Sequence, residues 1–205
     1  MKKVLFIAVM LFVMTGVVSA QVPTPFSLYA GGAVSIPNSP DAFADLYKTG
    51  FHGSVGVGLK VMPGLQTVAK VEFHRFKLDH EASQAINPLL IGEDIAGGHN
   101  NMWMFGADLR YSIPIPQPAF KPFIIGGLGL ARISSTEFDG TSSLVASLNE
   151  FQPEAQNNVY FNIGAGFEFP TGPKMNLFGQ VRYVSIATEG ESSSFIPITI
   201  GLKFF

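Results

Sequence analysis

Two histidines and a glutamate form the group in this sequence that most resembles a chemical site. His52 lies on one predicted strand, and Glu72 and His74 share a face of the next. A Pro-Gly turn between the strands brings His74 opposite His52 or Ser54. Two imidazoles and a carboxylate can bind a transition metal, and they are also parts of a Ser/His/acid set. We interpret the three as polar filling and as candidate metal ligands only, and we assign no catalytic residue or cofactor.

Charged residues recur at the positions of other predicted strands that carry small or polar side chains. If the strands close into a narrow barrel, these positions point inward, although the facing of the fifth strand, which contains Arg132, is ambiguous. An isolated charge in such an interior would be costly. We therefore predict a network of paired charges that fills the lumen and fixes the register, made of Lys60, Lys70, Glu72, Asp108, Arg110, Arg132, Glu168, Arg182 and Lys203.

The elements that must position these residues are strands. Eight segments alternate apolar residues with small or polar ones, a period of two that is typical of strands with two different faces. The small faces are rich in Gly, Ser and Ala, which suits the lumen of an eight-stranded barrel better than the solvated surface of a soluble sandwich or lipocalin-like barrel. The predicted strands span residues 26–36, 51–61, 67–77, 103–113, 123–133, 159–169, 177–186 and 195–205.

The connections between these segments are of two kinds. Short turns that contain Pro63, Pro114 and Pro170 alternate with four longer polar loops, and 12 of the 15 acidic residues fall in those loops. Outer-membrane barrels have short periplasmic turns and long external loops. We therefore expect periplasmic termini and four surface loops. The acidic loops are candidates for binding divalent cations or basic partners, but we interpret them as a solvated face with an unknown surface ligand at most.

The first 20 residues carry an export signal. Lys2 and Lys3 precede an apolar run that ends in Val18-Ser19-Ala20, which is typical of a cleavable signal peptide. The run has about 15 residues, fewer than the roughly 17–25 of a spanning helix. We therefore predict a signal peptide over residues 1–20 and a barrel domain over residues 21–205. The sequence has no cysteine, which excludes a lipid-anchored lipoprotein and a disulfide framework.

Composition narrows the class further. Of the 13 Lys and Arg residues, two belong to the signal peptide, so the predicted barrel domain has 11 basic against 15 acidic residues and a net charge of −4. No basic patch is visible, which argues against nucleic acid as a partner. Charged residues make up only 14% of the chain, and the apolar residues are interleaved with polar ones. This pattern indicates an all-β transmembrane barrel in the outer membrane, in contact with lipid.

Lipid offers no hydrogen-bond partners, so the first strand must pair with the last and close the sheet. The last segment, FIPITIGLKFF, has an apolar face suited to lipid, formed by Ile198, Ile200, Leu202 and Phe204, and it ends on Phe205. Trp103 and Tyr111 share the outward face of the fourth strand. Eight residues at about 3.4 Å each and a tilt near 40° span roughly 21 Å, close to the apolar band between two aromatic girdles.

Three segments also resemble a known family. KPFIIGGLGLAR (residues 121–132), VRYVSI (181–186) and FIPITIGLKF (195–204) are similar to the corresponding strands of the OmpA-like or opacity-type outer-membrane β-barrel family. The resemblance implies an eight-stranded antiparallel up-and-down barrel, inserted by the barrel insertion machinery and present as a monomer. The last residue in the family is usually the Phe of the assembly signal. Here Phe204 has that parity and Phe205 follows it.

These observations leave three functions open. The first is a non-enzymatic outer-membrane barrel with a side-chain-filled lumen, which presents four loops for structural or surface-interaction roles. The second is a narrow channel for small solutes. The third is a lipid-modifying enzyme of the outer membrane, for which an inward histidine pair is badly placed, because a lipid ester lies at or outside the wall.

Overall fold

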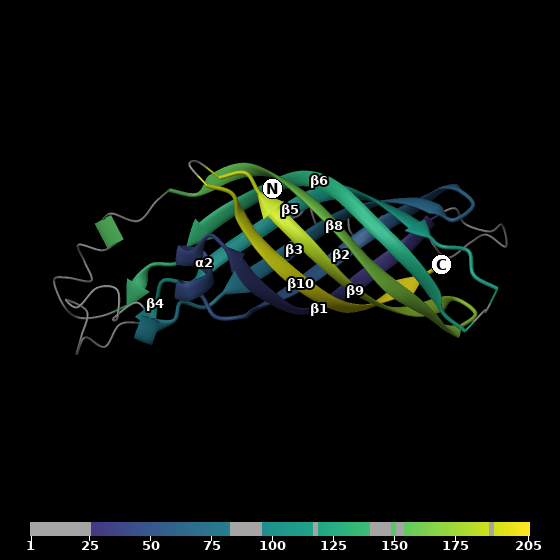
Figure 1. The fold of residues 1–205 in the computed structure, drawn as a ribbon, viewed down its shortest axis with the longest axis horizontal. Coiled ribbons are helices and arrows are strands. Elements are labelled where there is room, and N and C mark those ends of the chain that lie inside the picture. The colour runs from purple at the N-terminus through teal and green to yellow at the C-terminus, as the bar shows by residue number, and fades with distance from the viewer. Residues whose placement is uncertain (1–25, 83–95, 117–118, 140–148, 151–153, 189–190) are drawn as a thin grey trace, which may run out of the picture.

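The computed structural model of the chain describes residues 26–82, 96–116, 119–139, 149–150, 154–188 and 191–205. The predicted signal peptide and its cleavage point lie outside these residues. Eight long strands form one closed sheet (Figure 1). In chain order they are β1 (Phe26–Ser39), β2 (Gly50–Met62), β3 (Leu65–Phe76), β5 (Asn100–Ser112), β6 (Lys121–Ser135), β8 (Gln156–Gly172), β9 (Met175–Ile186) and β10 (Ser193–Phe204).

Each barrel strand pairs in antiparallel fashion with the next barrel strand along the chain, and β1 pairs with β10 to close the ring. In this closing ladder Val34 lies opposite Ile198, and Gly32 lies opposite Ile200. The predicted eight-stranded antiparallel up-and-down barrel is confirmed. The strands are longer than the roughly 9–11 residues that cross a membrane at a tilt, since they contain from 12 residues in β10 to 17 in β8.

The alternation of side chains gives the barrel two different walls. Large apolar residues on the outer wall are exposed, for example Leu128 at 67% and Ile163 at 64%. Buried charged residues and amides lie on the opposite parity and line the lumen, among them Glu72 at 2%, Asp108 at 1% and Asn162 at 3%. This is the reverse of a water-soluble barrel, whose apolar face is buried. The outer wall is suited to an apolar environment.

The facing of β6 corrects one prediction. Phe123, Ile125 and Ala131 are buried on the lumen side, so the alternate parity faces outward. Arg132 belongs to that outward parity and is exposed, opposite Trp103 on β5. The prediction that Arg132 points inward was therefore wrong. In a strand of mostly Gly, Ile, Leu and Ala, both faces are apolar, so periodicity gave no choice between them.

The two ends of the barrel differ. One end, the short-turn end, holds the connections β2–β3, β5–β6 and β8–β9 and the last strand residue, Phe204. The other, the long-loop end, carries the short helix α2 (Asp41–Leu46) and a two-stranded sheet of β4 (Ala96–Gly97) and β7 (Phe138–Asp139) (Figure 1). None of the helices among the described residues is long and apolar enough to cross a membrane.

The long-loop end of the barrel is filled by apolar side chains. We call this group the apolar plug; its buried members are Phe43, Phe76, Met102, Met104, Ala131, Tyr160, Val184, Ile186 and Phe195. Phe43 comes from α2, and its ring centre lies 5.1 Å from that of Phe76. Since α2 has six residues and no side-chain N-cap bond, burial of Phe43 in the plug supplies stability that so short a helix lacks.

Candidate functional site: the barrel lumen

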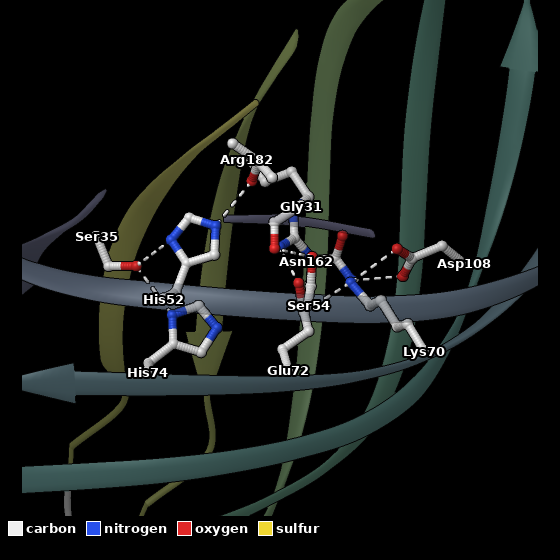
Figure 2. Close-up of polar contacts among 11 residues, drawn as sticks. Gly31, Ser35, His52, Ser54, Lys70, Glu72, His74, Asp108, Asn162 and Arg182 are labelled. Atoms are coloured by element: carbon white, nitrogen blue, oxygen red, sulfur yellow. Dashed lines mark hydrogen bonds and ion pairs between the residues drawn. The ribbon is translucent and has the colours of Figure 1, made fainter. Parts of the chain in front are cut away.

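The first group of charges in the lumen is the Glu72 cluster, which consists of Lys70, Glu72, Asp108 and Arg182 (Figure 2). The Arg182 guanidinium donates hydrogen bonds to both Glu72 carboxylate oxygens, one of them 3.0 Å long. The Lys70 Nζ lies 3.0 Å from Glu72 Oε2 and 2.7 Å from Asp108 Oδ2. Two cations and two carboxylates therefore balance each other in the middle of the barrel.

An amide completes this cluster. Asn162 Nδ2 donates a 2.9 Å hydrogen bond to Asp108 Oδ1. Asp108 thus accepts one bond from β8 and lies within ion-pair distance of Lys70 on its neighbouring strand, β3. Satisfying a buried carboxylate from two sides lowers the cost of removing it from water.

The second group, the Glu168 cluster, lies nearer the short-turn end and consists of Arg110, Glu168 and Lys203. Arg110 Nη2 donates a 2.6 Å hydrogen bond to Glu168 Oε2, and Lys203 Nζ lies 3.2 Å from Oε1. Asn176 Nδ2 also donates to this carboxylate. Two cations share one carboxylate here, so the cluster has one uncompensated positive charge among the groups described.

Aromatic rings surround the excess positive charge of the Glu168 cluster. The Arg110 guanidinium carbon lies 3.5 Å from the centre of the Phe123 ring and 5.3 Å from that of Tyr29. The Lys203 Nζ lies 5.6 Å from the Tyr29 ring centre. The negative face of an aromatic ring attracts a cation, by about 2 kcal/mol when water is excluded. These rings partly offset the cost of burying the second cation.

A third polar group joins β1, β2, β3 and β10 above the Glu72 cluster, toward the long-loop end. The Ser35 hydroxyl lies 3.1 Å from His52 Nδ1 and 2.9 Å from His74 Nδ1, and the two rings stack with centres 5.0 Å apart (Figure 2). His52 Nε2 is within 3.0 Å of Thr199 Oγ1. One hydroxyl can donate to only one imidazole, so the other ring must donate to it. We call these four residues the Ser35 group.

The predicted metal ligands do not converge on one point. His52 lies directly opposite His74, as one of the two predicted registers requires, but both Nδ1 atoms face Ser35. Glu72 is occupied by Arg182 and Lys70. No group of three or more His, Asp and Glu side chains within the described ranges is arranged to hold a metal ion. The arrangement suits hydrogen bonding between strands better than coordination.

Of the nine residues predicted for the lumen network, seven lie in the Glu72 and Glu168 clusters. Lys60 has the inward parity, but it is exposed near the short-turn end and makes no ion pair with a described residue. Arg132 lies on the outer wall. Between the two clusters is a cavity of about 40 Å³, lined among others by Tyr29, Lys70 and Gln180. That volume has room for a few water molecules.

The predicted girdle and closing-strand residues lie on the outer wall. Trp103 is 46% exposed and Tyr111 42% exposed. Ile198, Ile200 and Phe204 are also exposed, and Leu202 is half-buried. Strand β10 ends at Phe204, and the backbone N–H of Phe205 donates to the Lys174 carbonyl at 3.1 Å. The final Phe is thus held against the β8–β9 turn outside the ladder.

Sequence reasoning missed several residues that complete these groups. Ser35, Thr199, Asn162 and Asn176 hydrogen-bond the predicted histidines and carboxylates. Their inward parity was a usable signal, because an uncharged polar side chain inside a narrow barrel must find a partner. For Phe43 and helix α2 the local sequence gave no comparable signal, since their position depends on the plug.

Comparison with known proteins identifies the architecture. The sequence profile of the family described as "Outer membrane protein beta-barrel domain" matches residues 6–204. The crystal structure of Neisserial surface protein A superimposes with a TM-score of 0.60 at 16% identity, over 88% of this chain and 97% of the other. A major outer membrane protein from Thermus thermophilus gives 0.51 at 13% identity, over 87% and 97%.

A weaker likeness involves an enzyme. The outer membrane enzyme PagL superimposes with a TM-score of 0.42 at 15% identity, over 88% of this chain and 99% of the other. A likeness at this level carries no argument about catalysis. No curated protein matches the sequence. The structural likenesses establish the fold alone.

Proposed function

Because the chain belongs to the outer membrane protein beta-barrel domain family, we propose that it is a non-enzymatic outer-membrane protein whose filled barrel presents four surface loops. The barrel serves as a rigid, closed support, and the loops serve structural or surface-interaction roles. Short turns lie on the periplasmic side of such barrels. The long-loop end, with α2 and the β4–β7 sheet, then faces the exterior of the cell.

The observation that carries the proposal is the way the lumen is filled. Two ion-pair clusters and the Ser35 group occupy its middle, and the apolar plug occupies the long-loop end. Glu72 and Arg182 belong to opposite walls and are joined across the barrel axis. A solute path through the described part of the lumen would have to break these contacts. The arrangement favours a structural support over the narrow channel.

The lipid-modifying alternative receives no support from the geometry of the histidines. His52 and His74 are 4% and 0% exposed, and their shared hydroxyl on Ser35 is also buried. An acyl ester of a membrane lipid lies along the outer wall, on the far side of the strand backbone from this group. A nucleophile must come within hydrogen-bond distance of its base and also contact the substrate.

The loops at the long-loop end offer a surface that is partly fixed in place. Helix α2 is held by Phe43, and Tyr47 and Leu78 form an isolated bridge beside it. Exposed carboxylates extend from this surface, among them Asp41, Asp45 and Glu137. An acidic, anchored surface is suited to a partner that carries positive charge, and we include the binding of such a partner in the proposal.

Two measurements test the proposal. Purified protein reconstituted in planar lipid bilayers should give no single-channel openings above the baseline of protein-free bilayers, and regular openings would overturn the filled-lumen proposal in favour of the channel. Mass spectra of outer-membrane lipids from a strain that lacks the gene should match those of the parent strain. A lipid species missing from the deletion strain and restored by the wild-type gene would show an enzyme.

A further inference from the structure

The outer wall near the long-loop end carries three cations. Arg75 lies near the end of β3 with outward parity, Lys77 follows β3, and Arg132 lies on the outward face of β6. None of these side chains makes an ion pair with a residue in the described part of the chain. In the lumen, by contrast, every charge of the Glu72 cluster is matched.

These cations flank a row of outward aromatic rings. Phe51, Phe73 and Trp103 lie on the adjacent strands β2, β3 and β5, with ring centres 6.3 Å and 4.9 Å apart along the row. Arg75 is the cross-strand neighbour of Phe51, and Arg132 is that of Trp103. Aromatic rows on the wall of a membrane barrel mark the boundary between hydrocarbon and polar head groups. The guanidinium groups therefore lie at head-group level.

The spacing of the cations fits one head group. Arg75 and Arg132 are two strands apart, with β5 between them. Strands are about 4.8 Å apart, so the two backbones are separated by roughly 10 Å sideways and about 7 Å along the strand. The long side chains of Arg75 and Arg132 can extend toward each other and reach a group that lies between them. A phosphate between them would accept charge-assisted hydrogen bonds, often bidentate from Arg.

Neighbouring groups also favour the binding of a phosphate at this place. Asn101 and Ser134, paired across β5 and β6, are outward and half-buried, and both can donate hydrogen bonds. The nearby carboxylate of Asp79 lies 3.3 Å from Lys48 and is thus already paired. Burial lowers the pKa of His99, and the positive charges of Arg75 and Lys77 lower it further. Arg75 and Lys77 thus lie close enough to His99 for their charges to act on it together.

Directly below the aromatic row the wall is apolar. Phe105 on β5 and Leu130 on β6 form a cross-strand pair and are 51% and 58% exposed. Val71 on β3 pairs with Phe105 on its other side. A molecule held by the cations would thus lie with any hydrocarbon chains against this wall. The cations above and the apolar surface below are complementary to an acylated lipid with a phosphate head group.

We propose that the outward face of β3, β5 and β6 at the long-loop end binds a phosphate-bearing, multiply acylated lipid of the outer leaflet. Arg75, Lys77 and Arg132 hold the phosphate, Trp103 packs beside the head group, and the wall around Phe105 and Leu130 contacts the acyl chains. We call these surfaces together the lipid face. The inference rests on residence in the outer membrane and is independent of the surface role proposed above.

The chain supplies its own reporter for this test. Trp103 is the single tryptophan in the sequence and lies beside Arg132. The protein is placed in nanodiscs of phosphatidylcholine and titrated with lipid A, a multiply acylated glycolipid with two phosphates, while Trp103 emission is recorded. We expect a saturable change in emission for the wild-type protein.

The matched variant is the triple substitution Arg75→Gln/Lys77→Gln/Arg132→Gln, and the control is Lys174→Gln, which removes an exposed cation near the short-turn end. A cation close to an anionic lipid surface contributes about 1 kcal/mol, so we expect a roughly fivefold loss of affinity for each cation and about 100-fold for all three. Lys174→Gln should bind like the wild-type protein. A heat-dependent shift on SDS gels verifies that each variant is folded.

Two further probes separate the possible ligands. Dephosphorylated lipid A should bind as weakly to the wild-type protein as lipid A binds to the triple variant, and inorganic phosphate alone should leave the emission unchanged. Equal binding of lipid A to the wild-type protein and the folded triple variant would overturn the proposal. Equal binding of the dephosphorylated lipid would overturn the role of the phosphate, and saturable binding of inorganic phosphate alone would overturn the assignment to a lipid.

Discussion

Glu72 and Arg182 are 110 residues apart in the sequence, yet they join opposite walls of the barrel through two hydrogen bonds. In the ring of strands β3 and β9 are separated by four steps in either direction, which places them diametrically across the lumen. The other ion pairs among the described lumen residues lie within β3 or join strands one or two steps apart. The Glu72–Arg182 pair is therefore the ion pair, among those of the described lumen residues, that connects opposite walls of the barrel.

We expect Glu72→Gln to be the most destabilising single charge substitution in the lumen. Arg182 is 1% exposed, so loss of the carboxylate leaves a buried guanidinium without a counter-charge. Breaking a buried pair in this way costs about 3–5 kcal/mol. Urea unfolding in phospholipid vesicles measures the loss. Glu154→Gln, an exposed carboxylate near the start of β8, serves as the control and should unfold like the wild-type protein.

The double variant Glu72→Gln/Arg182→Met tests whether the destabilisation comes from the unpaired charge. It removes both members of the pair and leaves Lys70 with Asp108, which are still balanced. We expect it to be more stable than Glu72→Gln alone, because buried pairs can be replaced by neutral groups at little cost. Additive losses from the two substitutions would show that the residues act independently.

Close packing of β5 against β6 predicts different outcomes for two glycines. A Cβ at Gly127 would overlap the carboxylate of Asp108 and the carbonyl oxygen of Ala107, whereas a Cβ at Gly53 would have nothing within 4 Å. Gly127→Ala should therefore destabilise the barrel by about 1–3 kcal/mol. Gly53→Ala should be neutral or stabilising by up to about 1 kcal/mol. Equal unfolding midpoints for the two variants would contradict this packing.

Removal of the Ser35 hydroxyl should affect both histidines at once. In Ser35→Ala the Nδ1 atoms of His52 and His74 lose their shared partner while they stay buried. An unsatisfied buried polar group costs about 1–3 kcal/mol, measured as a shift in the urea midpoint. The comparison variant is Ser54→Ala, which loses one longer bond of 3.3 Å to a carbonyl. A smaller shift for Ser35→Ala than for Ser54→Ala would refute the linking role of Ser35.

The same geometry predicts that the stability of the protein does not depend on a bound metal ion. Because the imidazoles face Ser35 and Glu72 is paired with Arg182, we expect dialysis against a chelator to leave the thermal midpoint unchanged. Zinc retention, measured by elemental analysis, should be the same for the wild-type protein and for His52→Ala/His74→Ala. Stoichiometric zinc in the wild-type protein that disappears in the double variant would restore the metal hypothesis.

Outside the strands, His99 gives a pH dependence with a defined sign. Burial, followed by the charges of Arg75 and Lys77, lowers its pKa from 6.5. Protons therefore bind more readily to the unfolded chain, so the contribution to stability is complete above about pH 6.5 and is lost as the pH falls toward the folded pKa. Thermal midpoints of wild-type protein and His99→Gln should converge as the pH falls from about 8 to 5. Because both proteins contain His52 and His74, the contribution of these lumen histidines cancels in the difference between the two thermal midpoints.

The facing of most strands could be predicted because each strand alternates strictly and the two walls of the barrel differ. Strand β6 was the exception. There both faces are apolar and Arg132 was grouped with the inward charges, but on the outer wall near head-group level an exposed guanidinium is tolerated and can extend away from the hydrocarbon. Lys60 shows the complementary error, since its parity is inward but its position near the end of β2 leaves it exposed.

The choice of partners could not be read from the sequence. Parity places Glu72 in the lumen on the same face of β3 as Lys70, but whether it also meets Arg110 or Arg182 depends on the stagger of the closed ring. Helix α2 was missed for a related reason: six residues have little helical stability of their own, and Phe43 is held by residues from other parts of the chain.

The pairing of β1 with β10 has a consequence for the folding of the protein. Leu28 pairs with Phe204, near the two extremes of the described chain. The ring can therefore close only after all other strands are available, and closure carries the entropy of joining distant segments. Until then β1 and β10 are two open edges, each able to pair with a foreign strand. The interval between synthesis and ring closure is thus the time of greatest exposure to aggregation, and protection of those two edges is what a cell has to provide.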